Sequence, residues 1–207
     1  MNVIRLTYSI AYKYIKRMID FDSKIMKISL KPLFISIGVA LYSSSTFAWD
    51  HGVTIGYGYA KELGESYINK GFLLDMTLYK IQADSKLDFS LKASTAYWKS
   101  ETTDNNTLFT AGIGIGARAY FTRTGWVSPY IHASISPSYI SAKKFGNKEQ
   151  GSHFVFQDTF GFGVEIGPPN GNKIDINYMF IHYSNANLFT PNNGYDIPAV
   201  VNIGYLF

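Results

Sequence analysis

The feature that most constrains this chain is an alternation of apolar with small or polar residues that recurs through most of residues 52–207. The stretch 108–121, LFTAGIGIGARAYF, is typical, with Phe, Ala and Ile on one parity and Thr, Gly and Arg on the other. Side chains alternate between the two faces of a strand, so this period of two predicts strands rather than helices. No stretch after Trp49 is apolar for long enough to form a membrane-spanning helix.

The alternation divides into about eight segments of similar length. We expect strands near 52–61, 69–81, 86–99, 107–122, 126–141, 153–166, 173–184 and 197–207. Each reaches or exceeds the roughly 9–11 residues with which a tilted strand crosses a bilayer. The connections alternate between short turns (QADS, TRTG, PPNGN) and longer polar loops (KELGESYI, SETTDNN, AKKFGNKEQGS, NANLFTPNNGYD). Short turns at one end and long loops at the other are typical of outer-membrane barrels.

A soluble β-sandwich also shows alternation, and two features argue against it. The polar parity is mostly Gly, Ser and Thr with isolated charges, which suits the filled polar interior of a narrow barrel. These charges are Asp88, Lys92, Arg118, Glu165 and Asp175. The chain also ends in AVVNIGYLF, which resembles the C-terminal assembly signal of bacterial outer-membrane barrels. We therefore predict an all-β fold: one domain, residues 49–207, forming an eight-stranded antiparallel transmembrane β-barrel of the outer-membrane type.

Residues 1–48 read as a targeting region. From Met26 onward the sequence has lysines, then an apolar stretch over 33–41, then small residues up to Ala48. This is the pattern of a secretory signal peptide, and its apolar core is well short of the roughly 20 residues of a membrane anchor. We expect cleavage after Ala48 and a translation start at Met26, with 1–25 an N-terminal extension.

The charge and the absence of Cys exclude several classes of function. Of the 19 Lys and Arg residues 7 lie in 1–48, and so do 2 of the 15 Asp and Glu residues, so the remainder has a net charge of −1. The body of the chain therefore carries no nucleic-acid-binding patch. With 0 Cys, neither a disulfide nor a thiolate metal site can form.

The most informative short stretch is IHYSNANLF, residues 181–189. His182 and Ser184 continue the more apolar parity of the segment 173–184, which faces lipid in an outer-membrane barrel. Counting from the short turn PPNGN, these two residues emerge at the outer interface, at about the depth of the ester bonds of outer-leaflet lipids. They are two residues apart on one face, about 6.6 Å along the strand, so an imidazole can reach the hydroxyl.

A serine becomes a nucleophile when an adjacent base accepts its proton. Such a base needs an orienting acceptor, and the oxyanion needs amide donors. Polar residues of both kinds follow within a dozen positions: Asn185, Asn187, Asn192, Asn193 and Asp196. No G-x-S-x-G elbow is present, which excludes an α/β-hydrolase. The alternative is that His182 and Ser184 merely hydrogen-bond to lipid headgroups.

The residues HYSNA at 182–186 and PNNGYD at 191–196, with a final strand ending in Phe207, resemble the lipid A 3-O-deacylase (PagL) family. The resemblance implies an eight-stranded outer-membrane barrel that removes the ester-linked 3-position acyl chain of lipid A. It also implies roles for individual residues: Ser184 as nucleophile, His182 as general base, Asp196 as the acidic third member, and Asn185, Asn192 and the amide of Ala186 at the oxyanion site.

Asp196 departs from the family pattern, in which the acid is usually Glu, a side chain longer by one methylene. Unbroken alternation through 197–207 would also give Asp196 the inward parity. Either Asp196 lies in the preceding loop, or the pair of His182 and Ser184 works with a weak orienting group. The implied reaction is acyl transfer to Ser184 and then hydrolysis, without metal or cofactor. The acyl chain would lie along the outer wall, because so narrow a barrel has no room inside.

Other polar and aromatic residues have simpler interpretations. Lys143, Lys144 and Lys148 either meet lipid A phosphates or form a solvated basic loop. His51, His132 and His153 are not expected to bind metal, and Trp49, Trp98 and Trp126 are interpreted as interface-belt or packing residues.

Two other functions remain open. One is a non-enzymatic small barrel for adhesion or membrane stabilisation, and the other is a related esterase that acts on phospholipid. The expected location is the bacterial outer membrane and the expected partner is outer-leaflet lipid A or lipopolysaccharide, with a homodimer left open.

Overall fold

The structure is a computed structural model, and it describes residues 51–207. The predicted signal peptide, with its cleavage after Ala48 and the start at Met26, lies outside the described residues, as does Trp49.

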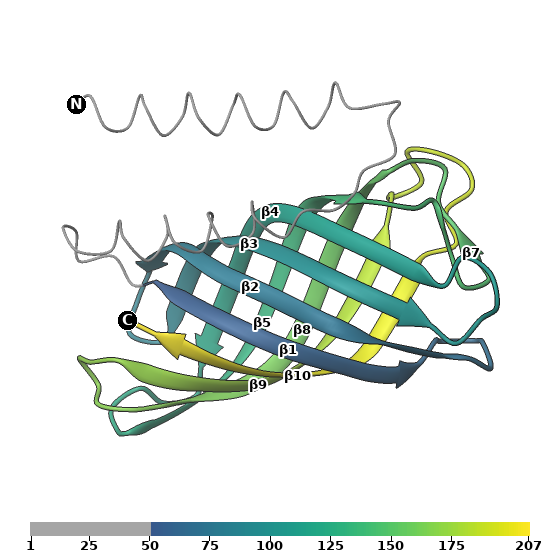
Figure 1. The fold of residues 1–207 in the computed structure, drawn as a ribbon. Helices are drawn as coiled ribbons and strands as arrows, with labels where there is room; N and C mark the ends of the chain where they lie inside the picture. The colour runs from purple at the N-terminus through teal and green to yellow at the C-terminus, as the bar shows by residue number, and fades with distance from the viewer. Residues whose placement is uncertain (1–50) are drawn as a thin grey trace, which may run out of the picture. The chain divides into compact units, whose positions relative to one another are not determined.

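Eight long strands form a closed antiparallel barrel in the order β1-β10-β9-β8-β5-β4-β3-β2 (Figure 1). The strands are β1 Gly52–Lys61, β2 Ile68–Gln82, β3 Leu87–Ser100, β4 Thr107–Tyr120, β5 Val127–Ile140, β8 Phe154–Ile166, β9 Lys173–Ser184 and β10 Tyr195–Leu206. The barrel closes where β1 pairs with β10, from Gly52 opposite Leu206 to Gly58 opposite Val200. Closure removes the unpaired sheet edges that could not be tolerated in lipid.

The predicted eight-stranded antiparallel barrel is confirmed, and each strand ends within two residues of the expected position. Two short strands were not predicted: β6 Lys144–Phe145 and β7 Lys148–Glu149 form a hairpin within the loop between β5 and β8. Strands of two residues are too short to leave a periodic pattern. No helix within residues 51–207 is long and apolar enough to cross a membrane.

The inward side chains divide the barrel interior into two parts. Toward the end with the long loops lies an apolar cluster around Trp98, whose indole Nε1–H donates to the Tyr183 hydroxyl at 3.0 Å. Toward the end with the short turns the interior is ionic: Arg118 lies 2.6 Å from Glu165 and 2.9 Å from Asp175. Both parts are filled, so the barrel has a packed interior rather than a channel.

The outward side chains form an apolar wall. Exposed large hydrophobic residues occur on every barrel strand, for example Ile55, Phe72, Ile115, Phe160 and Ile203. A soluble protein would leave such a surface against water, whereas a barrel embedded in lipid buries it. This wall excludes the sandwich alternative and sets the environment in which any outward polar residue must act.

Candidate active site on the outer wall

A histidine and an aspartate form a hydrogen-bonded pair on the outside of the barrel. His182 on β9 lies directly opposite Asp196 on β10, and its Nδ1 is 2.7 Å from Asp196 Oδ1. An ionised carboxylate can only accept, so Nδ1–H is the donor and Nε2 is left free to accept a proton. The Asp196 side chain is 12% exposed and that of His182 is 36% exposed, so the imidazole faces outward with its carboxylate partner largely shielded.

The inward parity expected for Asp196 is wrong, and a β-bulge is the reason. Ile197 pairs with Ile181, but the next pair along β10 is Val200 with Met179, so two residues of β10 between these pairs lie opposite one residue of β9. An extra residue reverses the parity of everything beyond it. Asp196 therefore points outward. Without the bulge, the alternation of β10 would place its side chain in the interior.

The other predicted residue on this face is Ser184, the last residue of β9, which follows His182 by one full period of the strand. It pairs with Phe156 on β8 and is half-buried. Its hydroxyl makes no hydrogen bond within residues 51–207 and is thus free to approach a substrate.

Gly194 fixes the position of the imidazole from the loop side. A Cβ placed on Gly194 would lie 2.8 Å from His182 Cε1, and the backbone there has a positive φ of 66°. Only glycine combines that conformation with so close an approach. The residue therefore allows the loop 185–194 to approach the Cε1 edge of the ring.

A second carboxylate, Asp158 on β8, was not singled out from the sequence. It lies directly opposite His182 on the side away from Asp196, so His182 has a carboxylate residue as its direct neighbour on each adjacent strand. The sequence could have pointed to it, because Asp158 is the one charged residue on the outward parity of β8. No hydrogen bond within the described residues joins it to His182, so Asp196 is the one of these two carboxylates that is hydrogen-bonded to the imidazole.

The loop after Ser184 is braced by its own amides. The side chain of Asn185 donates from Nδ2 to the carbonyls of Phe189 at 2.7 Å and Pro191 at 3.2 Å, and its backbone N–H donates to Asn192 Oδ1 at 3.0 Å. Both Nδ2 hydrogens of Asn185 are thus already used. This side chain braces the loop, and the oxyanion role predicted for Asn185 stays a prediction.

The other two residues predicted for the oxyanion site retain free donors. Ala186 is exposed, has a positive φ of 52°, and its N–H has no acceptor within residues 51–207. Asn192 spends one Nδ2 hydrogen on Asn187 Oδ1 at 3.1 Å and keeps the second. Both lie in the loop that begins directly after Ser184.

Behind Asp196 lies a buried carboxylate, Glu62, just beyond the end of β1. Its Oε1 accepts the backbone N–H of Asp196 at 3.0 Å, and its Oε2 accepts Asn69 Nδ2 at 2.5 Å. Burial raises the pKa of Glu62 to about 7, although Lys148 of the β6–β7 hairpin lies 3.6 Å away. The backbone of the orienting acid is thus held by the loop at the end of β1.

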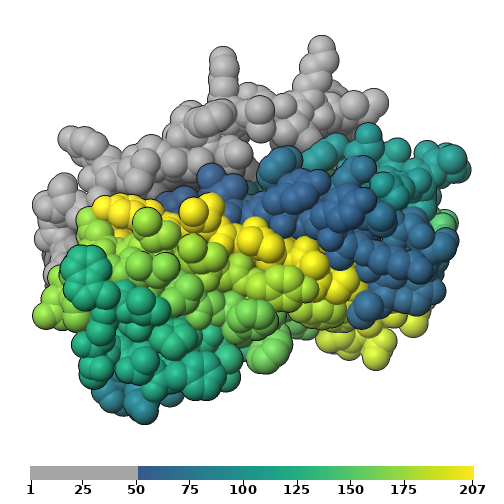
Figure 2. Space-filling view, turned by 90° about the horizontal axis from the view of Figure 1, so that it is seen from below, coloured from purple at the N-terminus to yellow at the C-terminus, as the bar shows by residue number. Residues whose placement is uncertain are grey.

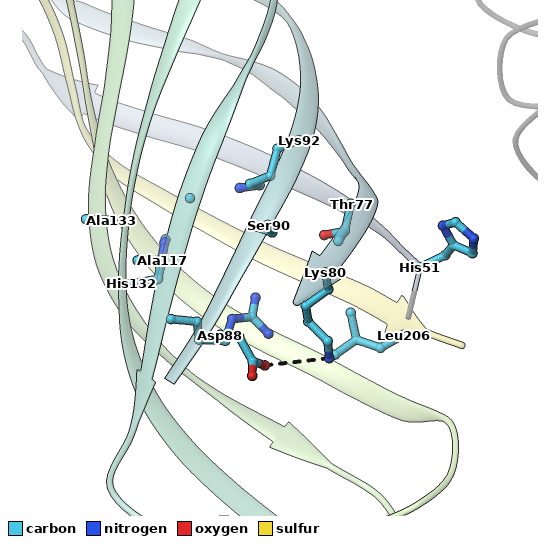
Figure 3. A pocket seen from close by; sticks show the side chains of 12 residues that line it. His51, Thr77, Lys80, Asp88, Ser90, Lys92, Ala117, His132, Ala133 and Leu206 are labelled. Atoms are coloured by element: carbon cyan, nitrogen blue, oxygen red, sulfur yellow. Dashed lines mark ion pairs between the residues drawn. The ribbon is translucent and has the colours of Figure 1, made fainter. Parts of the chain in front are cut away.

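A small cavity lies elsewhere in the described chain. This small cavity is in the ionic part of the interior, where Figure 3 shows Lys80, Asp88, Lys92 and His132. Its ionic groups are already paired: Lys80 with Asp88 at 3.7 Å and Lys92 with Asp75 at 3.0 Å. We therefore interpret it as part of the packed interior. Among residues 51–207 no group of three or more His, Asp or Glu residues is placed to hold a metal ion.

The fold and the site together define a class: an outer-membrane β-barrel that carries a histidine–carboxylate pair beside an unbonded serine on its apolar outer wall. Comparison with known proteins gives the family. The sequence model of the family described as Lipid A 3-O-deacylase (PagL) matches residues 70–205, and the chain belongs to this family.

Individual relatives agree with that assignment. The lipid A deacylase PagL of Bordetella bronchiseptica is 27% identical over 81% of this chain and 91% of its own length. The protein of the same name from Pseudomonas aeruginosa is 35% identical over 33% of this chain and 37% of its own length.

Two solved structures share the fold. The outer-membrane enzyme PagL has a TM-score of 0.53 at 22% identity and matches 75% of this chain and 98% of its own. Neisserial surface protein A has a TM-score of 0.56 at 16% identity and matches 76% of this chain and 95% of its own. The predicted family, the ester-hydrolase class and the outer-membrane location are confirmed.

Proposed function

We propose that this protein is a lipid A 3-O-deacylase that hydrolyses the ester-linked 3-position acyl chain with Ser184, His182 and Asp196, on the side facing the outer leaflet. The observation that carries the proposal is the 2.7 Å hydrogen bond from His182 Nδ1 to Asp196 on the lipid-facing wall. A carboxylate that fixes the tautomer of a histidine beside a free serine has a purpose in acyl transfer and none in a purely structural wall.

The chemistry proceeds in two steps. Ser184 Oγ attacks the ester carbonyl carbon while its proton passes to His182 Nε2, and the tetrahedral intermediate collapses as His182 protonates the departing sugar 3-oxygen. Water then attacks the acyl-enzyme with His182 again as base, which releases the fatty acid and restores the serine. Asp196 stays ionised throughout and stabilises the imidazolium.

The developing oxyanion needs donors that are not already used. We assign the N–H of Ala186 and the remaining Nδ2 hydrogen of Asn192 to this role, and to Asn185 the bracing of the loop that carries both. In other hydrolases, removal of one such donor lowers kcat about 10²–10³-fold.

The acyl chain lies along the outer wall in this proposal. Below the site on β8 and β9 the outward residues are apolar and aromatic, including Phe160, Phe162 and Tyr178. Phe162 and Tyr178 stack with centroids 5.6 Å apart, which offers a continuous surface for a fatty chain. The packed interior offers none.

Expression in a Gram-negative host followed by mass spectrometry of its lipid A tests the proposal. The wild-type protein should remove one 3-linked acyl chain, and Ser184→Ala should remove none while assembling in the outer membrane to the same level. Identical lipid A from the two strains contradicts the proposal, and release of acyl chains from phospholipid alone shows a different substrate. A homodimer stays a prediction that the mass of the protein in detergent tests.

A further inference from the structure

Ionisable side chains are rare on the outer wall of the barrel. Across the eight barrel strands, only six Asp, Glu, Lys, Arg or His residues point outward: Lys61, Lys70, Lys99, Asp158, His182 and Asp196. They occupy six neighbouring strands, in the order β8, β9, β10, β1, β2 and β3. One half of this row is the proposed catalytic site, and the other half consists of three lysines.

The lysines lie at the same level of the barrel as the catalytic pair. The backbone of Asp196 is held by the sequence neighbours of two of these lysines: its N–H donates to Glu62 and its carbonyl accepts Asn69 Nδ2 at 3.4 Å. Lys61 and Lys70 directly adjoin Glu62 and Asn69 in sequence. Figure 2 shows the strands that carry these residues, with β10 in yellow running between β9 in green and β1 and β2 in blue.

The positive charges of the three lysines are only weakly balanced by acidic groups within residues 51–207. Lys70 and Lys99 are a directly opposed cross-strand pair, an arrangement in which like charges destabilise a sheet. Glu101 lies 3.3 Å from Lys70, but both side chains are about two-fifths exposed, so the pair is weak. Lys61 and Lys99 have no ion-pair partner within residues 51–207. A bound anion would relieve this repulsion.

Aromatic residues fix the depth of the row. Tyr57, Tyr59, Phe72 and Tyr97 are exposed on the same three strands, toward the middle of the barrel from the lysines. Tyrosines gather at the level of lipid headgroups, so lysines just beyond them lie at the level of headgroup phosphates.

We propose that Lys61, Lys70 and Lys99 bind the phosphate groups of the lipid whose ester bond reaches Ser184. This inference rests on the proposed deacylase function and adds the recognition of the anionic headgroup to it. With strands about 4.8 Å apart, the lysines lie two, three and four strands from His182, or roughly 10, 14 and 19 Å around the wall. A headgroup with more than one phosphate can then lie across β10 to β3 while its acyl ester lies at β9.

The lysines of the long loop are less suited to this role. Lys144 pairs with Glu149 at 3.3 Å, and Lys148 lies 3.6 Å from Glu62 and donates to the carbonyl of Leu63 at 3.3 Å. The Lys144 pair lies within the β6–β7 hairpin, and the Lys148 contacts hold the hairpin onto the loop after β1. Recognition of phosphate is therefore assigned to the outer wall rather than to the hairpin.

The test is a kinetic comparison of two substrates in detergent micelles: lipid A with its phosphates and the same lipid A after their removal. A lysine near an anionic lipid surface contributes about 1 kcal/mol to the free energy of binding, which is roughly fivefold in affinity. The triple variant Lys61→Gln, Lys70→Gln, Lys99→Gln should raise KM for the phosphorylated lipid about 100-fold and leave kcat and the dephosphorylated substrate unchanged. The corresponding triple Lys→Arg variant should retain wild-type KM, and Lys86→Gln, in a turn at the opposite end, serves as the control for the removal of a single positive charge, as in Lys61→Gln or Lys99→Gln alone.

A binding measurement separates this proposal from the proposed function. In a Ser184→Ala background, equilibrium binding of phosphorylated lipid A should weaken by the same factor when the three lysines are replaced, and added salt should weaken it in the parent. Unchanged binding, or an equal loss for the dephosphorylated lipid, overturns the phosphate site. Wild-type protein that binds phosphorylated lipid A through the lysines but releases no acyl chain overturns the deacylase function alone. If the triple variant does not fold, Lys61→Gln and Lys99→Gln separately should each raise the dissociation constant about fivefold, and the absence of this rise also overturns the site.

Discussion

Replacement of Asp196 by Asn tests the central contact of the site. The carboxylate accepts from His182 Nδ1 at 2.7 Å and thereby keeps the proton on that nitrogen. An amide of the same shape can present its NH₂ group instead, which favours the tautomer with the proton on Nε2. Such an imidazole cannot accept the proton of Ser184, and it also loses the negative charge that stabilises the imidazolium.

The magnitude follows from the exposure of the pair. In a fully buried triad the same change lowers kcat about 10⁴-fold. Here the His182 side chain is 36% exposed, so water screens part of the interaction. We therefore expect a loss of about 10²–10³ in kcat, which corresponds to roughly 3–4 kcal/mol of transition-state stabilisation. KM should change little, because Asp196 faces His182 rather than the substrate.

The assay is release of 3-hydroxy fatty acid from purified lipid A by detergent-solubilised protein, quantified by mass spectrometry. Asp196→Glu restores a carboxylate and should recover part of the rate, while Asp104→Asn, in an exposed loop, controls for the change of charge. If Asp196→Asn retains activity within threefold of wild type, the orienting role is wrong. A loss at Asp158→Asn that equals or exceeds the loss at Asp196→Asn would assign the role to the other neighbour of His182.

Three further predictions follow from the geometry. Gly194→Ala should lower kcat at least tenfold with the barrel still assembled, because its Cβ would lie 2.8 Å from the imidazole; full activity in the same assay would contradict this. Glu62 has its pKa raised to about 7 from an unfolded value of 4.5, so its contribution to the stability of its loop is complete below pH 4.5 and is lost as pH rises through 7, by up to about 3 kcal/mol. Limited proteolysis of this loop should accordingly be faster at pH 9 than at pH 6 in wild type and independent of pH in Glu62→Gln, and equal pH dependence in both would refute it. Arg118→Ala leaves two interior carboxylates without their main partner and should destabilise the barrel by about 3–5 kcal/mol, seen as unfolding at lower urea concentration; an unchanged midpoint would show that the ionic interior contributes little.

The fold could be predicted because two separate patterns in the sequence indicate a barrel. Every strand alternates an apolar wall with a small or polar interior, and the loops alternate in length. Both patterns are local, so neither depends on how the strands pair. The β6–β7 hairpin was missed for the opposite reason, since it has only four paired residues and is held by contacts with distant loops, such as the bond from the N–H of Asn147 in its turn to the Tyr67 hydroxyl at 3.2 Å.

Prediction of the site was uneven for a related reason. His182 and Ser184 share a strand, so their common face followed from parity alone. Their partners on other strands required the register, which the sequence does not contain. Asp158 and Asp196 are 24 and 14 residues from His182 in the chain, yet each is its direct neighbour in the sheet.

By itself, the sequence determined that this chain forms a small barrel in a membrane, and that a histidine and a serine face outward together near one end. Only the tertiary structure decided that Asp196 joins them. One extra residue in β10 turns its side chain from the interior to the wall, and pairing with β9 brings it within 2.7 Å of the imidazole. The position of Lys61, Lys70 and Lys99 near this site also depends on the tertiary structure. Barrel closure joins β1 to β10 and thereby places residues of the first strands beside a site on the last two.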